Sequence, residues 1–374
     1  RDFLYYAGKS ESMRGNLKVS EQKIVILAEE SFSVLGSKAA TVLIRYHAQN
    51  IVAVIDSTKA GKSASEIIGI GEGIPVVASL DVAMSYDPTL LAIGIAPPGG
   101  ELPHNWHPVL VEAISNGLHI VSGMHHFLSD DVGLSNLAAK HDVVLWDVRK
   151  PPEDLPIATC QASEVLSTVI LTVGSDCRTG KMITAIELAN GLRSVDKRAI
   201  FCATGQNGIM VSGWGIAIDA VISDFTAGAA ETIVLQGAQD NDILVVEGQG
   251  SLFHPAYSGV TLSLLHGSQP DAMIFCHQPT RMQVARHTIK FPPLNEMISQ
   301  YETLVHPIKP AKIIGVSLNT FDLTFDQSLE VVESVEAETG LPTTDVIRFG
   351  SEKLVNSIID VSKKKDLLNA SLGT

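Results

Sequence analysis

Short apolar runs rich in Val, Ile and Leu recur along this chain, and longer mixed segments separate them. The segment Ser33–Tyr46, between two such runs, shows the recurrence expected of a helix. Strand, helix, strand with continuously apolar strands is the pattern of a parallel sheet covered on both faces. In the first part of the chain the apolar runs are Lys23–Ala28, Ile51–Ile55, Gly73–Val77, Leu90–Ala96, His119–Ser122 and Val143–Val148.

A proline-containing connector, Pro151–Ile157, follows these runs and predicts a linker. Beyond it the alternation resumes, with an amphipathic helix at Ser328–Thr339 and a tail after Val361 that we expect to fray. The sequence therefore predicts an α/β chain with a flexible leader, 1–22, and two parallel-sheet domains, 23–150 and 151–374. The expected strands of the second domain are Val169–Val173, Arg198–Ala203, Asp242–Val246, Ala272–Cys276, Lys312–Asn319 and Asp345–Phe349.

The polar, glycine-bracketed segment between Val173 and Ile183 predicts an anion-binding loop, because it joins an expected strand to an expected helix. Such a loop presents unpaired backbone N–H groups and the positive end of the helix dipole, and Lys181 adds a full charge. The residues expected to contact the anion are Gly174, Ser175, Asp176, Cys177, Arg178, Thr179, Gly180, Lys181 and Thr184.

This loop departs from the G-x-x-x-x-G-K-[ST] pattern of nucleotide-binding P-loops. Ser175 stands where the first glycine is expected, and Met182 replaces the hydroxyl residue that binds magnesium. The nearest hydroxyl after the lysine belongs to Thr184. The sequence favours anion binding over hydrolysis of a metal-bound nucleotide, and a tight turn with a solvated lysine is the alternative.

Polar residues follow other expected strands of the second domain. Glu247 comes directly after an apolar run, at the position where a carboxylate of P-loop enzymes holds magnesium. Gln206, Gln249 and His254 lie in glycine-containing segments after two strands, and ordinary loop hydrogen bonding is their alternative role. Arg149, beside the linker, can pair with a substrate carboxylate or with a surface acid. We expect Arg149, Gln206 and Gln249 to contact the substrate.

Composition limits the classes of function. The chain has 374 residues, 18% of them charged, and a formal net charge of −14. A nucleic acid or an anionic membrane is bound by a basic surface, so neither is an expected partner, and the low charged fraction favours a homo-oligomer. The four cysteines are widely spaced, which predicts neither a zinc site nor a disulfide framework. A reducing cytoplasm fits this usage, and no metal is expected.

Several short pieces of the first domain occur in a shared order: Gly61-Lys62, the G-x-P-V segment at Gly73, the Pro97-Pro98 pair and Ser122-Gly123. In this order they resemble the CoA-binding Rossmann-type domain of succinyl-CoA ligases. The resemblance implies CoA binding with Lys62 and Pro98 as contacts, although Lys62 has simple solvation as its alternative. The G-x-G-x-x-G fingerprint is missing after the first strand, which disfavours NAD.

Further motifs span nearly the whole chain: Gly94–Gly100, Trp146–Lys150, Gly174–Cys177 with Gly180–Met182, Ala203–Gly208 and Glu247–Pro255. As a set they resemble a bacterial and archaeal family long labelled only as a domain of unknown function. In that family a Rossmann-like domain precedes a P-loop domain similar to dethiobiotin synthetase. The family includes D-glutamate N-acetyltransferases that use acetyl-CoA, so the resemblance implies this fold and this activity.

Two classes of enzyme follow as hypotheses. The first transfers an acetyl group from acetyl-CoA to an acidic amino acid, with D-glutamate as the expected small-molecule substrate and Lys181, Glu247 and His254 as the catalytic candidates. The alternative is an ATP- and magnesium-dependent ligase or kinase of the dethiobiotin synthetase type. A non-catalytic protein that binds a nucleotide or CoA is a third reading.

Overall fold

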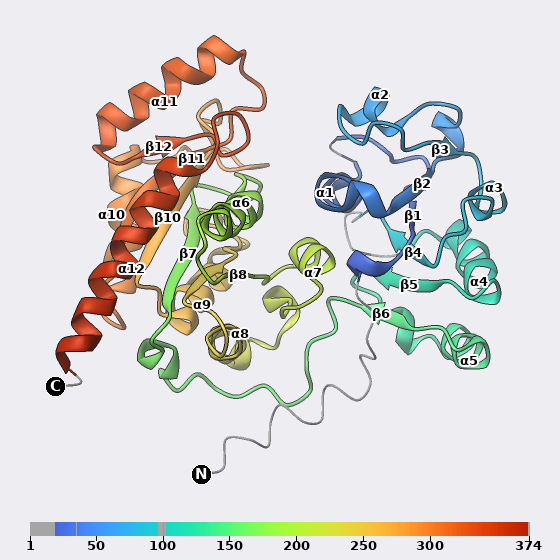
Figure 1. Ribbon diagram of the computed structural model, residues 1–374, viewed down its shortest axis with the longest axis horizontal. Helices are drawn as coiled ribbons and strands as arrows, with labels where there is room; N and C mark the ends of the chain where they lie inside the picture. The colour runs from blue at the N-terminus through green and yellow to red at the C-terminus, as the bar shows by residue number, and fades with distance from the viewer. Residues whose placement is uncertain (1–18, 35, 96–99, 101, 373–374) are drawn as a thin grey trace. The chain divides into compact units, whose positions relative to one another are not determined.

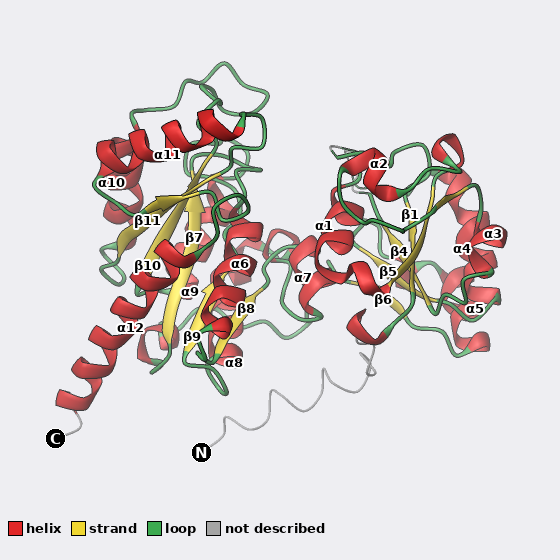
Figure 2. Ribbon diagram, turned by 45° about the horizontal axis from the view of Figure 1, so that its top comes forward, coloured by secondary structure: helices red, strands yellow, loops and turns green. Residues whose placement is uncertain are grey.

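The apolar runs of the sequence form the strands of two separate parallel sheets, each with six strands (Figures 1 and 2). The computed structural model describes residues 19–34, 36–95, 100 and 102–372. Its contacts divide the chain into two units. Unit 1 contains the described residues up to Pro152 together with Gln206–Ala220, and unit 2 contains Glu153–Gly205 and the described residues from Val221 onward. The predicted α/β fold class with two parallel sheets is confirmed.

The six strands of unit 1 are β1 (Ile24–Leu27), β2 (Ile51–Ile55), β3 (Val76–Val77), β4 (Leu90–Ile93), β5 (His119–Ser122) and β6 (Leu145–Asp147). They lie in the order β3-β2-β1-β4-β5-β6, so the direction of winding reverses between β1 and β4. Sheets of this kind bind ligands beyond the carboxyl ends of their strands at such a reversal. The helices of unit 1 are α1 (Lys38–His47), α2 (Ala64–Ile68), α3 (Leu80–Met84), α4 (His107–Ser115), α5 (Val132–His141) and α7 (Gln206–Ser212).

Helices cover both faces of the unit 1 sheet, with α1 on one face and α3, α4 and α5 on the other (Figure 1). This is why β1 and β4 are buried along their whole length. At the end of β2, the fully buried carboxylate of Asp56 accepts hydrogen bonds from the N–H groups of Phe32 and Thr58 at 2.9 and 3.0 Å. In dinucleotide-binding folds an acid near this position binds a ribose. Here it joins the loops after β1 and β2.

The strands of unit 2 are β7 (Thr168–Gly174), β8 (Ala199–Cys202), β9 (Ile243–Val246), β10 (Ala272–His277), β11 (Lys312–Leu318) and β12 (Thr343–Thr344). Their order is β12-β11-β10-β7-β9-β8, which places the completely buried β7 inside the sheet. Helices α6 and α12 pack against each other and on β7, and α8 packs on α9. The helices of unit 2 are α6 (Lys181–Ser194), α8 (Thr226–Gly237), α9 (Ser258–Ser268), α10 (Leu294–Val305), α11 (Phe325–Thr339) and α12 (Glu352–Leu372).

The segment Gln206–Ala220 packs with unit 1, although the chain on both sides of it belongs to unit 2. Its helix α7 contacts α1, and the His47 imidazole bonds the carbonyl of Val211 at 2.8 Å. An ion pair of 2.7 Å joins Arg149 to Asp219. The sequence-based division placed the whole segment in the second domain, because its helix is short and is followed by a loop without a clear pattern.

The second half of the predicted linker is docked on α8. The Pro156 carbonyl lies directly against Gly228. Three residues further along α8, the buried carboxylate of Glu231 accepts hydrogen bonds from the N–H groups of Thr159 and Ala162 at 2.8 and 3.3 Å. One face of this helix therefore fixes the chain where it enters unit 2.

The expected strand Asp345–Phe349 is wrong, because the strand β12 ends at Thr344 and a turn follows. The Asp345 carboxylate accepts hydrogen bonds from the N–H groups of Thr320 and Ile347 at 3.0 and 2.9 Å. A side chain that binds the backbone two residues later favours a turn over an extended strand.

The two ends of the described chain are more ordered than expected. The tail after residue 361 continues as helix α12, and Lys365 within it forms an ion pair of 2.9 Å with Asp271. Within the predicted leader, Val19–Glu21 forms a turn of 3-10 helix with Val19 buried. Residues 1–18 of that leader lie outside the described part of the chain.

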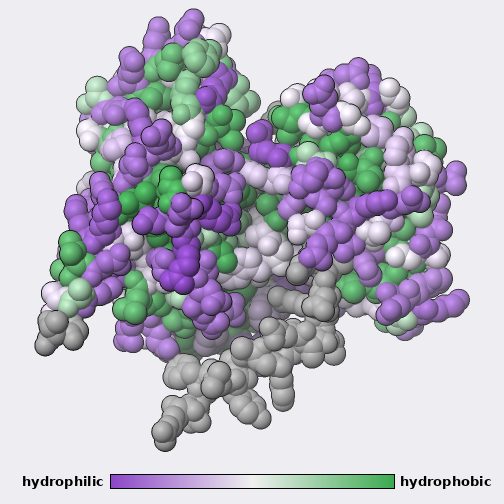
Figure 3. Space-filling model, in the orientation of Figure 1, coloured by the Kyte–Doolittle hydropathy of each residue, from purple (hydrophilic) through white to green (hydrophobic). Residues whose placement is uncertain are grey.

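Two features of the described residues concern the expected partners: the distribution of apolar side chains on the surface and the length of the apolar helices. On the face shown in Figure 3, apolar residues are scattered among hydrophilic ones. Among the helices that the structure describes, none is long and apolar enough to span a membrane.

Two helical glycines provide a matched test of the docked linker. A Cβ atom on Gly228 would lie 1.8 Å from the Pro156 carbonyl oxygen, whereas one on Gly259, in the first turn of α9, meets nothing within 4 Å. We expect Gly259→Ala to raise the free energy of unfolding by up to about 1 kcal/mol, because alanine is the better helix former. Gly228→Ala is expected to lower it by about 1–3 kcal/mol, because the linker must move. Urea unfolding followed by circular dichroism measures both changes, and an equal effect of the two substitutions would contradict the docking.

Candidate functional site

The loop between β7 and α6 has the backbone shape that an anion site needs. Arg178 and Gly180 adopt positive φ angles of 62° and 102°, so the chain reverses sharply before α6 begins at Lys181. At the position of Gly180, only glycine adopts this φ angle without strain. The unpaired N–H groups of the first turn of α6 therefore point back along the loop, as the sequence predicts.

Neighbouring segments hold the start of this loop in place. The Tyr301 hydroxyl donates to the Gly174 carbonyl at 2.7 Å and accepts from the N–H of Leu252 at 3.2 Å. Complete burial raises the pKa of Tyr301 to about 12, so the phenol keeps its proton. The Ser251 hydroxyl donates to the Ser175 carbonyl at 2.8 Å. The loop and the segment after β9 are thus one hydrogen-bonded structure.

Lys181 lies folded against the loop that precedes it. Its Nζ donates a hydrogen bond of 2.7 Å to the backbone carbonyl of Asp176, and the residue is only 6% exposed. Burial lowers the pKa of this ammonium group, although the charges of the carboxylates of Asp176 and Glu247 act in the opposite direction. A cation that burial destabilises gains the most from an anionic ligand that arrives beside it.

The Asp176 carboxylate binds a second segment, which begins at Arg281, to the loop. Its Oδ2 accepts hydrogen bonds from the Arg281 guanidinium at 3.0 Å and from the N–H of Ala285 at 2.7 Å. Arg281 also donates to the carbonyl of Cys177 at 2.7 Å. We call residues 281–290 the basic strap. A bridge between Gln283 and Lys290 closes it into a hairpin.

The hydroxyl group that binds magnesium in P-loops is missing directly after the lysine of this loop. Met182 follows the lysine, and the hydroxyl of Thr184 is buried and shares a hydrogen bond of 2.8 Å with Ser317 of β11. Thr184 was expected to contact the bound anion, but its side chain is directed to the sheet. The helical phase explains this, because position 184 is one turn beyond the loop and lies on the buried face of α6.

Glu247 and Gln249 lie together at the carboxyl end of β9. The Glu247 Oε2 accepts hydrogen bonds from the N–H groups of Thr204 and Gly205 at 3.0 and 3.2 Å. The Gln249 amide donates to the Thr204 carbonyl. A Cβ atom on Gly248, between these two residues, would lie 3.1 Å from Cδ of Lys181, so this segment lies against the loop between β7 and α6, which we call the phosphate loop. The structure thus brings Lys181, Glu247 and Gln249 together in unit 2.

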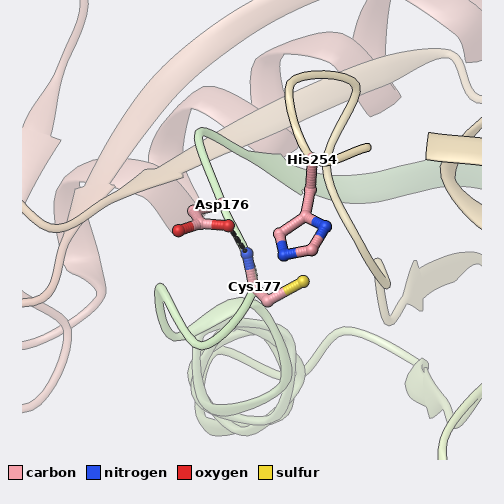
Figure 4. A group of neighbouring side chains, drawn as sticks. All are labelled: Asp176, Cys177 and His254. Carbon is pink, nitrogen blue, oxygen red and sulfur yellow. Dashed lines mark hydrogen bonds between the residues drawn. The ribbon is translucent and has the colours of Figure 1, made fainter. Parts of the chain in front are cut away.

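His254 points toward Cys177 and Asp176 (Figure 4), and one potential ligand atom from each of the three lies within 4.8 Å of the others. Carboxylate, thiol and imidazole are all metal-binding groups. However, the His254 Nδ1 accepts a hydrogen bond of 3.2 Å from the N–H of Ala256, and the Asp176 oxygens serve protein donors. We therefore assign no metal to this group. Burial raises the pKa of Cys177 and lowers that of His254, so both side chains are neutral near pH 7.

The remaining predicted residues lie in unit 1. Arg149 is buried and donates to Gln206 at 3.1 Å and to Asp219 at 2.7 Å, so its charge is already balanced. Binding of a substrate carboxylate by Arg149 stays a prediction that requires this pair to open. Lys62 is exposed in the loop between β2 and α2, and Pro98 lies outside the described residues.

The sequence interpretation missed Arg281, Tyr301 and His277, which all contact the loop. The sequence did contain a signal for Arg281. No acidic residue occurs between Asp271 and Glu296 in a chain with 41 acids, so the basic residues of this segment have no acidic neighbour in the sequence. For Tyr301, in the middle of α10, and for His277 the sequence pattern offered no signal, since one reads as core and the other as the end of a strand.

Two family descriptions match the chain in succession. Residues 57–151 match "Domain of unknown function (DUF1611_N) Rossmann-like domain", and residues 156–355 match "Domain of unknown function (DUF1611_C) P-loop domain". A crystal structure of a DUF1611 family protein from Anabaena variabilis superposes with a TM-score of 0.86 at 39% sequence identity. That match covers 91% of this chain and 99% of the other.

Two curated relatives carry the name D-glutamate N-acetyltransferase. The protein of Pseudoalteromonas sp is 39% identical over 269 residues, which are 71% of this chain and 80% of that protein. The protein of Tritonibacter scottomollicae is 38% identical over 285 residues, which are 76% of this chain and 85% of that protein.

The imidazole of His277 provides a pH test of the loop, since its Nδ1 shares a hydrogen bond of 2.8 Å with the Ser175 hydroxyl. Burial lowers the pKa of His277 from 6.5 to about 4. The unfolded chain therefore binds the proton more readily, and stability is lost as the pH falls through the unfolded pKa toward the folded one. Between pH 7 and pH 5 we expect this histidine to cost about 2 kcal/mol of unfolding free energy.

The matched variant is His277→Gln, which keeps a hydrogen-bonding amide and removes the titration. Urea unfolding of both proteins at the two pH values isolates the contribution of this histidine from that of the other histidines. An identical loss of stability in the wild type and in His277→Gln would show that His277 does not titrate in this way.

Proposed function

The chain belongs to the DUF1611 family of paired Rossmann-like and P-loop domains, and on that premise we propose that it transfers the acetyl group of acetyl-CoA to the amino group of an acidic amino acid. D-glutamate is the expected acceptor. The observation that carries the proposal is the name D-glutamate N-acetyltransferase of two relatives that are 38% and 39% identical over most of this chain.

The geometry of the loop supports a transferase over the ATP-dependent alternative. A ligase or kinase of the P-loop type holds magnesium through a hydroxyl and a carboxylate. In this chain Thr184 bonds Ser317, the Asp176 carboxylate is paired with Arg281, and Glu247 accepts two backbone N–H groups. The Thr184 hydroxyl and the Asp176 carboxylate, which a magnesium ion would use, are therefore bound by protein groups, whereas an anion without a metal can be met by the N–H groups and the ammonium group of Lys181.

The proposed reaction requires a base that takes a proton from the substrate ammonium and donors that stabilise the oxyanion. We assign the base to Glu247, because the N–H groups of Thr204 and Gly205 orient its carboxylate at the end of β9. Lys181 and the N–H groups at the start of α6 serve as the positive partners of an anionic group.

His254 was an alternative candidate for the base, and its geometry argues against that role. Its Nδ1 accepts the N–H of Ala256, so the neutral ring carries its proton on Nε2. The nitrogen directed at Cys177 and Asp176 in Figure 4 therefore offers a donor and no lone pair. We propose that His254 positions its neighbours and does not abstract a proton.

The direct test measures thiol release from acetyl-CoA with 5,5′-dithiobis(2-nitrobenzoate). The purified full chain, treated with a chelator, is mixed with D-glutamate, L-glutamate, D-aspartate or D-alanine. We expect thiol release with D-glutamate above all, together with a product that has the mass of N-acetylglutamate. No release with any amine, with thermal stabilisation by magnesium ATP but not by CoA, would contradict the transferase and support the ligase.

Substitution of Lys181 by methionine separates its proposed role from stability. We expect kcat/KM to fall by about 100-fold or more, because an anionic group loses its charged partner. The free energy of unfolding should stay the same or rise, since a buried cation disappears and the Thr179 hydroxyl still donates to the Asp176 carbonyl at 3.1 Å. Lys197→Met, at an exposed position, is the control. Full activity of Lys181→Met would remove Lys181 from the mechanism.

A further inference from the structure

The basic strap, residues 281–290, lies on the phosphate loop and is held there from two sides. Asp176 accepts hydrogen bonds from Arg281 and from the N–H of Ala285, as described above. The ring of His254 packs edge to face on that of His287 with a centroid distance of 5.1 Å. These contacts explain why Asp176, Cys177 and His254 lie together, because the strap packs on this group.

The strap concentrates positive charge in an acidic protein. The formal net charge of the chain is −14, yet the strap contains Arg281, Arg286 and Lys290 and no acid. Arg286 and Lys290 are exposed, as is Arg178 on the adjoining loop. Within the part of the chain that the structure describes, none of these three has an acidic side chain at ion-pair distance. Their charges are available to an anion from solution.

The position of these cations next to the loop is fixed by the backbone. Arg286 directly follows Ala285, whose N–H is bonded to Asp176, and Arg178 is two residues beyond that aspartate. The bridge between Gln283 and Lys290 returns the other arm of the hairpin to the same place. The loop N–H groups, Lys181 and the strap thus form one cationic surface in unit 2.

We propose that this surface binds the phosphate groups of coenzyme A, with Arg286 and Lys290 of the basic strap as direct contacts. The inference rests on the proposed function, which supplies an acyl-CoA as the donor. Coenzyme A carries a diphosphate and a 3′-phosphate, and a phosphate monoester alone has a charge of about −1.5 to −2 near pH 7. Arg178, Arg286, Lys290 and Lys181 match several phosphates better than the two carboxylates of an amino acid.

Direct binding tests the proposal without any catalytic step. Coenzyme A and 3′-dephospho-coenzyme A are titrated calorimetrically into the full-length wild type and into the double variant Arg286→Gln, Lys290→Gln. We expect the wild type to bind coenzyme A more tightly than the dephospho form, and the double variant to lose roughly tenfold or more in affinity for coenzyme A along with that preference. Added salt should weaken binding to the wild type more than to the variant.

The control is the double variant Lys197→Gln, Lys364→Gln, which removes the same charge. Both lysines are exposed. Lys197 precedes β8, and Lys364 is next to Lys365, which bonds the carbonyl of Ser167 before β7. Both therefore lie at the edge of the sheet opposite the loop, and we expect their substitution to leave the affinity for coenzyme A unchanged. An equal loss in both double variants would reduce the effect to net charge and overturn the proposal.

The outcomes separate this proposal from the proposed function. An affinity for coenzyme A that is unchanged in the strap variant overturns the strap site, even if the protein acetylates D-glutamate. A higher KM for the amino acid alone, with an unchanged KM for acetyl-CoA, also overturns it by assigning the strap to substrate carboxylates. Strap-dependent binding of coenzyme A without transfer to any amine would leave the site in place and refute the transferase.

Discussion

The buried carboxylate of Asp176 is the charge on which the candidate site depends. It is fully buried at the end of β7, and a carboxylate in that position must be met by donors because desolvation of an unpaired charge is costly. The donors are the N–H of Cys177, the guanidinium of Arg281 and the N–H of Ala285. Two of these belong to the basic strap, so the residue that shapes the phosphate loop also holds the segment that covers it.

The same arrangement occurs at the carboxyl ends of three other strands, β2, β6 and β12. Asp56 after β2, Asp147 in β6 and Asp345 after β12 are buried and accept backbone N–H groups from loops distant in sequence. In unit 1, Asp56 and Asp147 join loops, and their carboxylates accept hydrogen bonds from protein donors. In unit 2 the balance differs, because Lys181 and the cations of the strap bring positive charge in excess of the acids that they contact.

The local parts of the site were predictable from the sequence and its distant contacts were not. The loop at 174–181 and the position of Glu247 follow from the rule that polar residues after parallel strands gather at one edge of the sheet. Arg281 is far from Asp176 along the chain, and only the folded sheet places them 3.0 Å apart. Thr184 was a candidate anion contact, and Arg149 was a candidate partner for either a substrate carboxylate or an acid of the protein. The structure gives Thr184 the partner Ser317 and Arg149 the partner Asp219, and no local pattern identifies either partner.

The sequence by itself determined the fold class, the order of the strands along the chain and the family, because continuous apolar runs and glycine-bracketed turns are properties of neighbouring residues. Only the tertiary structure decided that Gln206–Ala220 packs with unit 1, that the residues after Thr344 form a turn, and that the basic strap lies on the phosphate loop. These depend on which groups can satisfy a buried charge or an unpaired N–H across the fold. That pairing is a property of the assembled chain, not of any segment within it.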